Sequence, residues 1–241
     1  MVDISTELAA CNVGKFTITA DVIVLPGAIF SYHAPRYRDL GYSPIPVFEN
    51  GKWPLEWSKY CSEAAPPDQI ERWGKVLNSN IALACGHRGL VVIDVDVNDK
   101  AILAAVLGAL PHCRIARFGS KGFALLCQYH KFEPVKFKNI YAPKDKDGQR
   151  KALVEIKGDG QNIQVPPSIH RKTGKPYIWI DPETGMPLTD QRCPPLDDLP
   201  LLFDADIERL RKALEPWAEK PREELSAAGA QGQPAALQWP P

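Results

Sequence analysis

The stretch Leu90-Val-Val-Ile-Asp-Val-Asp-Val97 decides the fold of this chain of 241 residues. Its first four residues are all apolar, which is typical of a strand buried on both faces near the centre of a sheet. Because side chains alternate between the two faces of a strand, Asp94 and Asp96 are expected on one face, with alpha carbons about 6.6 Å apart at a rise of ~3.3 Å per residue. The sequence therefore predicts a central strand whose end carries two carboxylates.

Two interpretations of this aspartate pair remain open. Two carboxylates at the end of an apolar strand repel each other and are poorly solvated, so one is protonated unless a cation lies between them. Mg²⁺ or Mn²⁺ suits such a place, because these ions prefer hard oxygen ligands and keep positions free for phosphate. The alternative is that Asp94 or Asp96 caps a helix that begins near Asn98, by accepting hydrogen bonds from its free amides.

The segments around this strand alternate between helical and extended patterns. Helices are expected over residues 34–40, 69–77, 98–110 and 204–217. Strands are expected over residues 80–85, 90–97, 114–118, 123–128, 152–157, 161–165 and 177–180, with 42–47 extended by its prolines. The strands 152–157 and 161–165 are predicted to form a hairpin, because Asp159-Gly160 is a favoured tight turn.

Composition narrows the classes of partner and the compartment. Lys and Arg together number 29, as do Asp and Glu, so the formal net charge is zero and a nucleic-acid site must be a local patch. No apolar run approaches the ~20 residues needed to cross a bilayer, so no membrane partner is expected. The six cysteines lack paired CxxC spacing and no secretory leader is visible, which predicts the cytoplasm of a bacterial or host cell and no zinc site.

A third carboxylate comes from the strand Leu153-Val-Glu-Ile-Lys157. Glu155 and Lys157 share one face of this strand, while Val154 and Ile156 share the other. The same alternation occurs on any half-solvated strand, so the pattern alone does not separate a catalytic Glu155 from a solvated one.

The most unusual string of the chain is Val165-Pro-Pro-Ser-Ile-His170. Its two prolines stiffen an extended backbone, which holds Ser168 and His170 out as hydrogen-bonding groups. Arg171 and Lys172 follow directly, and their charges fit phosphate. A rigid turn at the end of a strand is the alternative interpretation.

Taken in order, these strings resemble the primase-polymerase domain at the N-terminus of many replication proteins of phages, plasmids and mobile elements, a branch of the archaeo-eukaryotic primase superfamily. The similarity covers about residues 37–179. Its parts are Gly41-Tyr-Ser-Pro-Ile-Pro-Val47, Lys52-Trp-Pro54, Asn80-Ile-Ala-Leu-Ala-Cys-Gly86, Leu90-Val-Val-Ile-Asp-Val-Asp96, Val154-Glu-Ile-Lys-Gly158, and Val165-Pro-Pro-Ser-Ile-His170 with Gly174 and Tyr177-Ile-Trp179. Each part is common by itself, whereas the ordered set is specific.

The resemblance implies a template-dependent DNA primase/polymerase that transfers nucleotides from dNTPs or NTPs to a 3′-hydroxyl. Asp94, Asp96 and Glu155 would be its catalytic residues and would hold two divalent ions, Mg²⁺ or Mn²⁺, which in such sites lie about 3.5–4 Å apart. The implied partners are a single-stranded DNA template with its primer and, since such domains commonly precede a helicase, a helicase domain or protein.

The implied fold is α/β, and more narrowly α+β: an archaeo-eukaryotic primase-like core with a central mixed, largely antiparallel sheet and helices on one face. The core would span residues 34–200, with a smaller N-terminal α/β unit wrapping it. Residues 1–33 are expected to pack on the core and residues 201–220 to form a C-terminal helix. The segment 221–241, rich in Ala, Gly, Gln and Pro, is expected to be a linker or tail.

One motif departs from the family pattern. The second motif usually reads Ser-x-x-x-His, with a histidine that reaches the phosphates of the incoming nucleotide, but Gly119-Ser-Lys-Gly-Phe-Ala124 has alanine at that position. Lys121, Arg117 or His170 is expected to replace the lost contact, since each can donate to phosphate. The full set of expected nucleotide-binding residues is Arg117, Ser120, Lys121, Ser168, His170 and Arg171.

Template contacts are expected in a locally basic stretch that also contains aromatic side chains, an arrangement that suits single strands. The candidate residues are Lys136, Lys138, Tyr141, Arg150 and Lys151. A solvated lysine-rich loop is the alternative interpretation of the same stretch.

Three other functions remain open. With Ala124 in the second motif, the domain could bind nucleotide or single-stranded DNA without polymerising. A sugar transferase also uses an Asp-x-Asp pair at a strand end, but it does not account for Glu155 or for residues 166–170. The last alternative is a structural or interaction domain in which the motif set is a coincidence.

Overall fold

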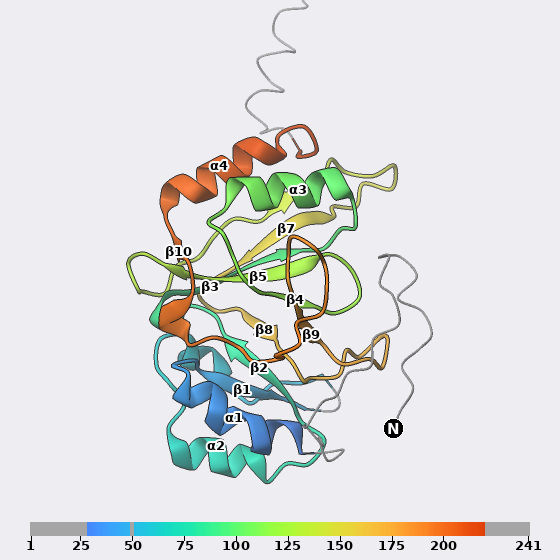
Figure 1. Ribbon diagram of the computed structural model, residues 1–241. Coiled ribbons are helices and arrows are strands. Elements are labelled where there is room, and N and C mark those ends of the chain that lie inside the picture. The colour runs from blue at the N-terminus through green and yellow to red at the C-terminus, as the bar shows by residue number, and fades with distance from the viewer. Residues whose placement is uncertain (1–27, 49–50, 220–241) are drawn as a thin grey trace, which may run out of the picture.

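The structure is a computed structural model that describes residues 28–48 and 51–219. Most of the predicted N-terminal segment 1–33, and all of the predicted tail 221–241, lie outside the described residues. Figure 1 shows two stacked parts, a small sheet with two helices at one end and a larger sheet with two helices at the other. No helix in the described part of the chain is long and apolar enough to span a membrane.

The larger sheet is seven-stranded, with the order β6-β7-β3-β5-β4-β9 and with β10 paired to β5. The β10 pairing is parallel and the others are antiparallel, so the predicted mixed, largely antiparallel sheet is confirmed. The strands are β3 Leu90–Val95, β4 Ala116–Phe118, β5 Phe123–Tyr129, β6 Ile140–Tyr141, β7 Ala152–Lys157, β9 Ile178–Ile180 and β10 Leu201–Leu202. The strand with the aspartate pair therefore lies at the centre of the sheet, between β7 and β5.

Two helices, α3 Lys100–Ala109 and α4 Asp204–Leu214, pack against each other on one side of this sheet (Figure 1). The side chain of Asp99 caps α3 by accepting hydrogen bonds from two backbone amides of its first turn, at 2.8 and 3.2 Å. The capping interpretation of Asp94 and Asp96 is therefore wrong, because Asp99 already fills that role. Of the two interpretations of the aspartate pair, the metal-binding one therefore remains.

Alternate side chains of β3 enter two different cores. Ile93 and Val95 belong to the core under α3 and α4. Leu90 and Val92 belong to the core shared with the smaller part of the molecule. Asp94 continues the second set, so its side chain lies on the face of the sheet that is turned away from the helices.

The smaller part is an α/β unit built mainly from the N-terminal half, in agreement with the expected fold. Its three-stranded sheet has the order β1-β2-β8. Its elements are α1 Ile29–Asp39, β1 Pro44–Val47, α2 Pro67–Gly74, β2 Asn80–Ala84 and β8 Asn162–Gln164. Short 3-10 helices lie at Trp57–Cys61, His87–Gly89 and Leu196–Asp198.

The predicted hairpin of residues 152–157 and 161–165 is wrong. The strands β7 and β8 both form, but β7 pairs with β6 and β3, while β8 pairs with β2 in the other sheet. The physical reason is that both edges of β7 are already occupied, so the chain that leaves the turn at Gly160 has no free edge of β7 to pair with. This turn therefore connects the two sheets.

Candidate active site

One row of residues crosses the centre of the larger sheet. Across neighbouring strands, Glu155 of β7 is paired with Asp94 of β3, Asp94 with Ala124 of β5, and Ala124 with Arg117 of β4. Directly opposed residues in antiparallel strands project on the same face, and neighbouring strands lie about 4.8 Å apart. Two carboxylates, a methyl group and a guanidinium therefore project side by side on the face away from the helices.

Arg117 reaches past Ala124 to Asp94. Its Nη2 lies 3.0 Å from Oδ1 of Asp94, and the two side chains are only 11% and 21% exposed. Ala124 is fully buried between the two strands and offers only a methyl group, so the long arginine side chain has room to pass it. The side chain at position 124, where the resemblance led us to expect a histidine, is thus small, and a cation from the next strand fills the adjoining space.

Lys157 holds a second cation against the same carboxylate. Its Nζ lies 3.5 Å from Oδ2 of Asp94 and also forms a short ion pair with Glu155. Burial disfavours the charged form of this lysine, but Asp94 and Glu155 outweigh that effect and raise the pKa of Lys157 above its usual value. A protonated ammonium group therefore bridges the two carboxylates.

Asp96 lies just beyond the end of β3 and is directed elsewhere. Its Oδ2 is 2.8 Å from Nζ of Lys121, and the two side chains are 50% and 40% exposed. Lys121 therefore neutralises Asp96, whereas Arg117 and Lys157 neutralise Asp94. The structure brings Asp94 and Glu155 together and leaves Asp96 at the rim.

Gly122 sets the position of the loop that carries Ser120 and Lys121. Its φ is +54°, and a Cβ added there would lie 1.8 Å from the carbonyl oxygen of Val95. Its amide donates a hydrogen bond of 2.8 Å to Oδ1 of Asn98. The missing side chain is what allows this loop to pack directly on the end of β3.

An aromatic and an imidazole complete the side of the site near Arg117. The guanidinium of Arg117 lies 4.8 Å from the ring centre of Tyr177, and the ring of His170 lies 5.3 Å from that of Tyr177. Burial, with the positive charges of Arg117 and Lys172, lowers the pKa of His170, so this imidazole is neutral near pH 7. The Nε of Arg117 is buried and makes no hydrogen bond with the described residues.

Two other predicted nucleotide-binding residues are placed differently. Ser168 is fully buried, and its hydroxyl exchanges hydrogen bonds of 2.7 and 2.8 Å with the backbone of Ile81. This serine is not exposed to a nucleotide, contrary to the prediction; it ties the loop after β8 to β2. Arg171 is exposed and lies against Gly51.

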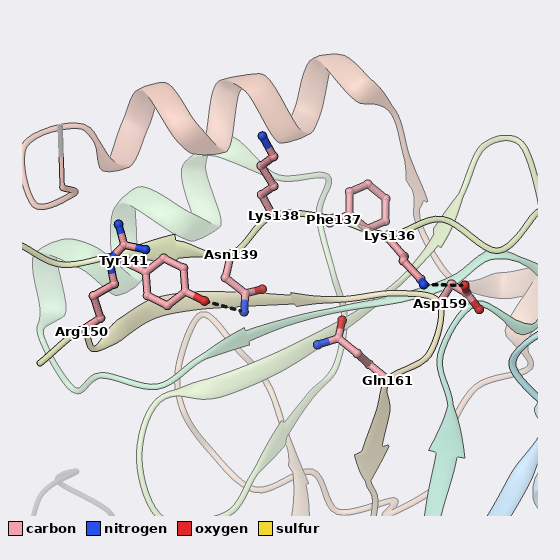
Figure 2. Close-up of a pocket in the computed structure, with 8 residues that line it drawn as sticks. All are labelled: Lys136, Phe137, Lys138, Asn139, Tyr141, Arg150, Asp159 and Gln161. Atoms are coloured by element: carbon pink, nitrogen blue, oxygen red, sulfur yellow. Dashed lines mark hydrogen bonds and ion pairs between the residues drawn. The ribbon is translucent and has the colours of Figure 1, made fainter. Parts of the chain in front are cut away.

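The predicted template residues gather at the β6 edge of the sheet. A hollow of about 560 Å³ lies there, lined by Lys136, Lys138, Tyr141 and Arg150 together with Phe137, Asn139, Asp159 and Gln161. Figure 2 shows these side chains. Lys151, which was also predicted, does not line this hollow. Its backbone oxygen instead accepts a hydrogen bond of 2.9 Å from Ala142.

The chemistry of the central pair fits a hard cation. Asp94 and Glu155 already share the ammonium group of Lys157 through carboxylate oxygens, the donor type that Mg²⁺ and Mn²⁺ prefer. Within residues 28–48 and 51–219, however, no three His, Cys, Asp or Glu side chains are close enough to hold an ion together. Asp94 and Glu155 could therefore hold a divalent ion in place of Lys157, and Asp96 would join them only by turning away from Lys121.

Two contributors to this site were not among the predicted site residues. Lys157 was visible in the sequence as the residue that shares a face with Glu155, but that alternation did not show that it would bridge two carboxylates. Tyr177 belongs to the string Tyr177-Ile-Trp179 of the resemblance, but that string did not show its contact with Arg117, which is made between residues 60 positions apart.

Comparison with known proteins agrees with this arrangement. The family model of the bifunctional DNA primase/polymerase N-terminal domain matches residues 34–200, which is more than half of the chain. The match contains the whole row from Glu155 to Arg117 and confirms the resemblance predicted from the ordered motifs. No curated protein matches the chain.

Proposed function

Since the chain belongs to the bifunctional DNA primase/polymerase N-terminal family, we propose that it is a template-dependent nucleotidyltransferase that adds dNTPs or NTPs to a 3′-hydroxyl during replication of a phage, plasmid or mobile element. The observation that carries the proposal is the row of Glu155, Asp94 and Arg117 on one face of the central sheet. This row places two carboxylates that suit a metal ion and one cation that suits phosphate next to one another on the sheet.

The carboxylates are the expected ligands of the metal. Asp94 and Glu155 would hold Mg²⁺ or Mn²⁺, with Asp96 as the third ligand once it leaves Lys121. A divalent ion bound there would neutralise charge on the triphosphate and lower the pKa of the attacking hydroxyl. While no metal is bound, the protonated ammonium group of Lys157 supplies the positive charge between the two carboxylates, and its pKa is raised by them.

Arg117 is the best-supported replacement for the missing histidine. It stands directly opposite Ala124 in the register, whereas Lys121 is directed to Asp96 and His170 reaches the site through Tyr177. A metal ion at Asp94 would compete with the Arg117 ion pair, which would release the guanidinium for the β- and γ-phosphates. Guanidinium groups bind phosphate through the same forked hydrogen bonds as carboxylate.

A second function, binding of nucleotide or single-stranded DNA without polymerisation, is favoured by one observation. Asp96 points to Lys121 instead of towards Glu155, so the three carboxylates are not grouped. This alternative predicts DNA or nucleotide binding with no incorporation under any metal.

Primer extension tests the proposal. The purified chain is given a labelled primer on a DNA template, with dNTPs or NTPs and with Mg²⁺, Mn²⁺ or EDTA. The proposal predicts templated extension that requires metal and is lost in Asp94→Asn, alongside a metal-induced thermal shift that is lost in the same variant. Binding without extension in every condition would favour the second function.

A further inference from the structure

The hollow at the β6 edge lies one strand away from Glu155. β6 pairs with β7, and Ile140 of β6 is opposite Val154, the residue before Glu155. Asn139 is also fixed to β7, because its Oδ1 accepts a hydrogen bond of 3.0 Å from the amide of Ile156. The wall of the hollow is therefore bonded to the backbone on both sides of the catalytic candidate.

Cationic side chains and an aromatic ring line this hollow together. The guanidinium of Arg150 lies 5.2 Å from the ring centre of Tyr141. Lys138 stands on the side of α4, and Lys136 is 79% exposed with a weak contact of 4.0 Å to Asp159 (Figure 2). An aromatic face among cations is the arrangement that stacks an unpaired base and neutralises its phosphate.

Two side-chain amides are held with their donors available. Oε1 of Gln161 accepts a hydrogen bond of 3.1 Å from the amide of Gly158, which leaves its NH₂ group for the hollow. The oxygen of Asn139 accepts the hydrogen bond from β7, and among the described residues its NH₂ group donates only a long hydrogen bond of 3.5 Å to the hydroxyl of Tyr141. Fixed NH₂ donors beside an aromatic ring suit the carbonyl oxygens and ring nitrogens of a base.

Arg150 already forms an ion pair with a carboxylate of the same chain, that of Glu219. Glu219 follows α4, and its amide donates a hydrogen bond of 2.8 Å to the backbone oxygen of Tyr141. Its carboxylate lies 2.6 Å from Nη2 of Arg150. Because guanidinium binds carboxylate and phosphate through the same geometry, Glu219 holds the place that a backbone phosphate would take.

We propose that this hollow binds one nucleotide of a single-stranded DNA template, with its base on Tyr141 and its phosphate on Arg150, and that Glu219 competes with that phosphate. The identity of the strand as template rests on the proposed function. A volume of about 560 Å³ falls in the usual range for small-ligand sites, about 300–1,000 Å³. A duplex has no free base face to offer Tyr141, which is why a single strand is the expected occupant.

Binding of a fluorescein-labelled 12-nucleotide single strand, followed by anisotropy in EDTA, tests the aromatic contact. Tyr141→Ala should weaken binding about tenfold or more, since base–aromatic stacking is worth ~1–3 kcal/mol per base. Tyr141→Phe should stay within about twofold of wild type, which also shows that the fold is intact. Tyr32→Ala is the matched control, because Tyr32 is an exposed tyrosine on α1 at the other end of the molecule and should change nothing.

The competition is tested with charge variants. Glu219→Gln should tighten binding about threefold, whereas Glu71→Gln, an exposed glutamate on α2, should not, although it changes the net charge equally. Arg150→Ala should weaken binding, and the gain from Glu219→Gln should vanish in the Arg150→Ala background.

Unchanged affinity in a folded Tyr141→Ala protein, or equal competition by a 12-base-pair duplex, overturns the site. Equal effects of Glu219→Gln and Glu71→Gln overturn the competition. Primer extension by the wild-type protein is measured separately. If the wild type extends the primer but Tyr141→Ala does not change strand affinity, the proposed binding site in the hollow is wrong and the proposed function stands. If the wild type binds the strand through Tyr141 but does not extend the primer, the proposed polymerase function is wrong and the proposed binding site stands.

Discussion

Replacing Asp94 with asparagine removes a carboxylate that lies between two nearly buried cations. Asparagine has almost the same shape, so the change isolates the charge. In the metal-free protein, Arg117 would then lose its ion pair, and Lys157 would keep only its ion pair with Glu155. A carboxylate at an empty metal site normally destabilises its fold. Because Asp94 has two cations beside it, we instead expect its replacement to lower the stability of the protein.

The size of this loss follows from burial. Removing one partner of a buried ion pair costs about 3–5 kcal/mol, whereas exposed pairs contribute about 1 kcal/mol or less. Asp94 is 21% exposed and its two partners are 11% and 15% exposed, so its value lies nearer the buried limit, at about 2–3 kcal/mol. For a domain of this size the melting temperature should fall by about 4–12 °C.

Urea unfolding in EDTA, followed by tryptophan fluorescence, measures this difference. The matched control is Asp96→Asn, whose pair with Lys121 is half exposed and should contribute no more than about 1 kcal/mol. Equal or greater stability of Asp94→Asn, at an unchanged dependence on urea, would contradict this expectation, because the two cations would then not depend on Asp94.

Three further results are expected. Arg117→Ala should raise the KM for dNTP about tenfold or more, measured by single-nucleotide incorporation at varied dNTP concentration. Arg117→Lys should recover part of this loss. An unchanged KM would show that Arg117 does not bind phosphate. Burial lowers the pKa of His33 and of His87, so below pH ~6.5 the unfolded chain takes up protons that the folded chain does not. Urea midpoints should therefore fall from pH 7.5 to 5.5, and a flat profile would contradict this. Gly122→Ala should lower the free energy of unfolding by about 2 kcal/mol or more, because its new methyl group meets Val95, and an unchanged melting temperature would argue against that contact.

Much of the fold could be predicted from local pattern. The apolar run Leu90–Ile93 predicted the central strand, because a strand covered on both faces is apolar at successive positions. The helix over residues 34–40 formed but begins at Ile29, since Ile29 and Phe30 are buried and α1 passes through Pro35. Tertiary packing set that boundary, and local signals did not show it.

The long-range pairings could not be predicted from the same signals. A favoured turn at Asp159-Gly160 predicted a hairpin, but which strand lies beside β7 depends on the whole sheet. The ion pair of Arg117 with Asp94 depends equally on the strand order, as does the contact of Glu219 with Arg150. Sequence reasoning therefore named the charged residues more readily than their partners.

Single-nucleotide incorporation tests directly whether the chain is a metal-dependent, templated nucleotidyltransferase. A labelled primer on a template that codes for one defined nucleotide is mixed with each dNTP in turn, with Mn²⁺ or EDTA, and with wild type or Glu155→Gln. We predict one added nucleotide only with the coded dNTP, Mn²⁺ and wild type, and no product from a Glu155→Gln protein that folds normally. Incorporation that survives Glu155→Gln, or no incorporation by wild type with either Mg²⁺ or Mn²⁺, would contradict this prediction.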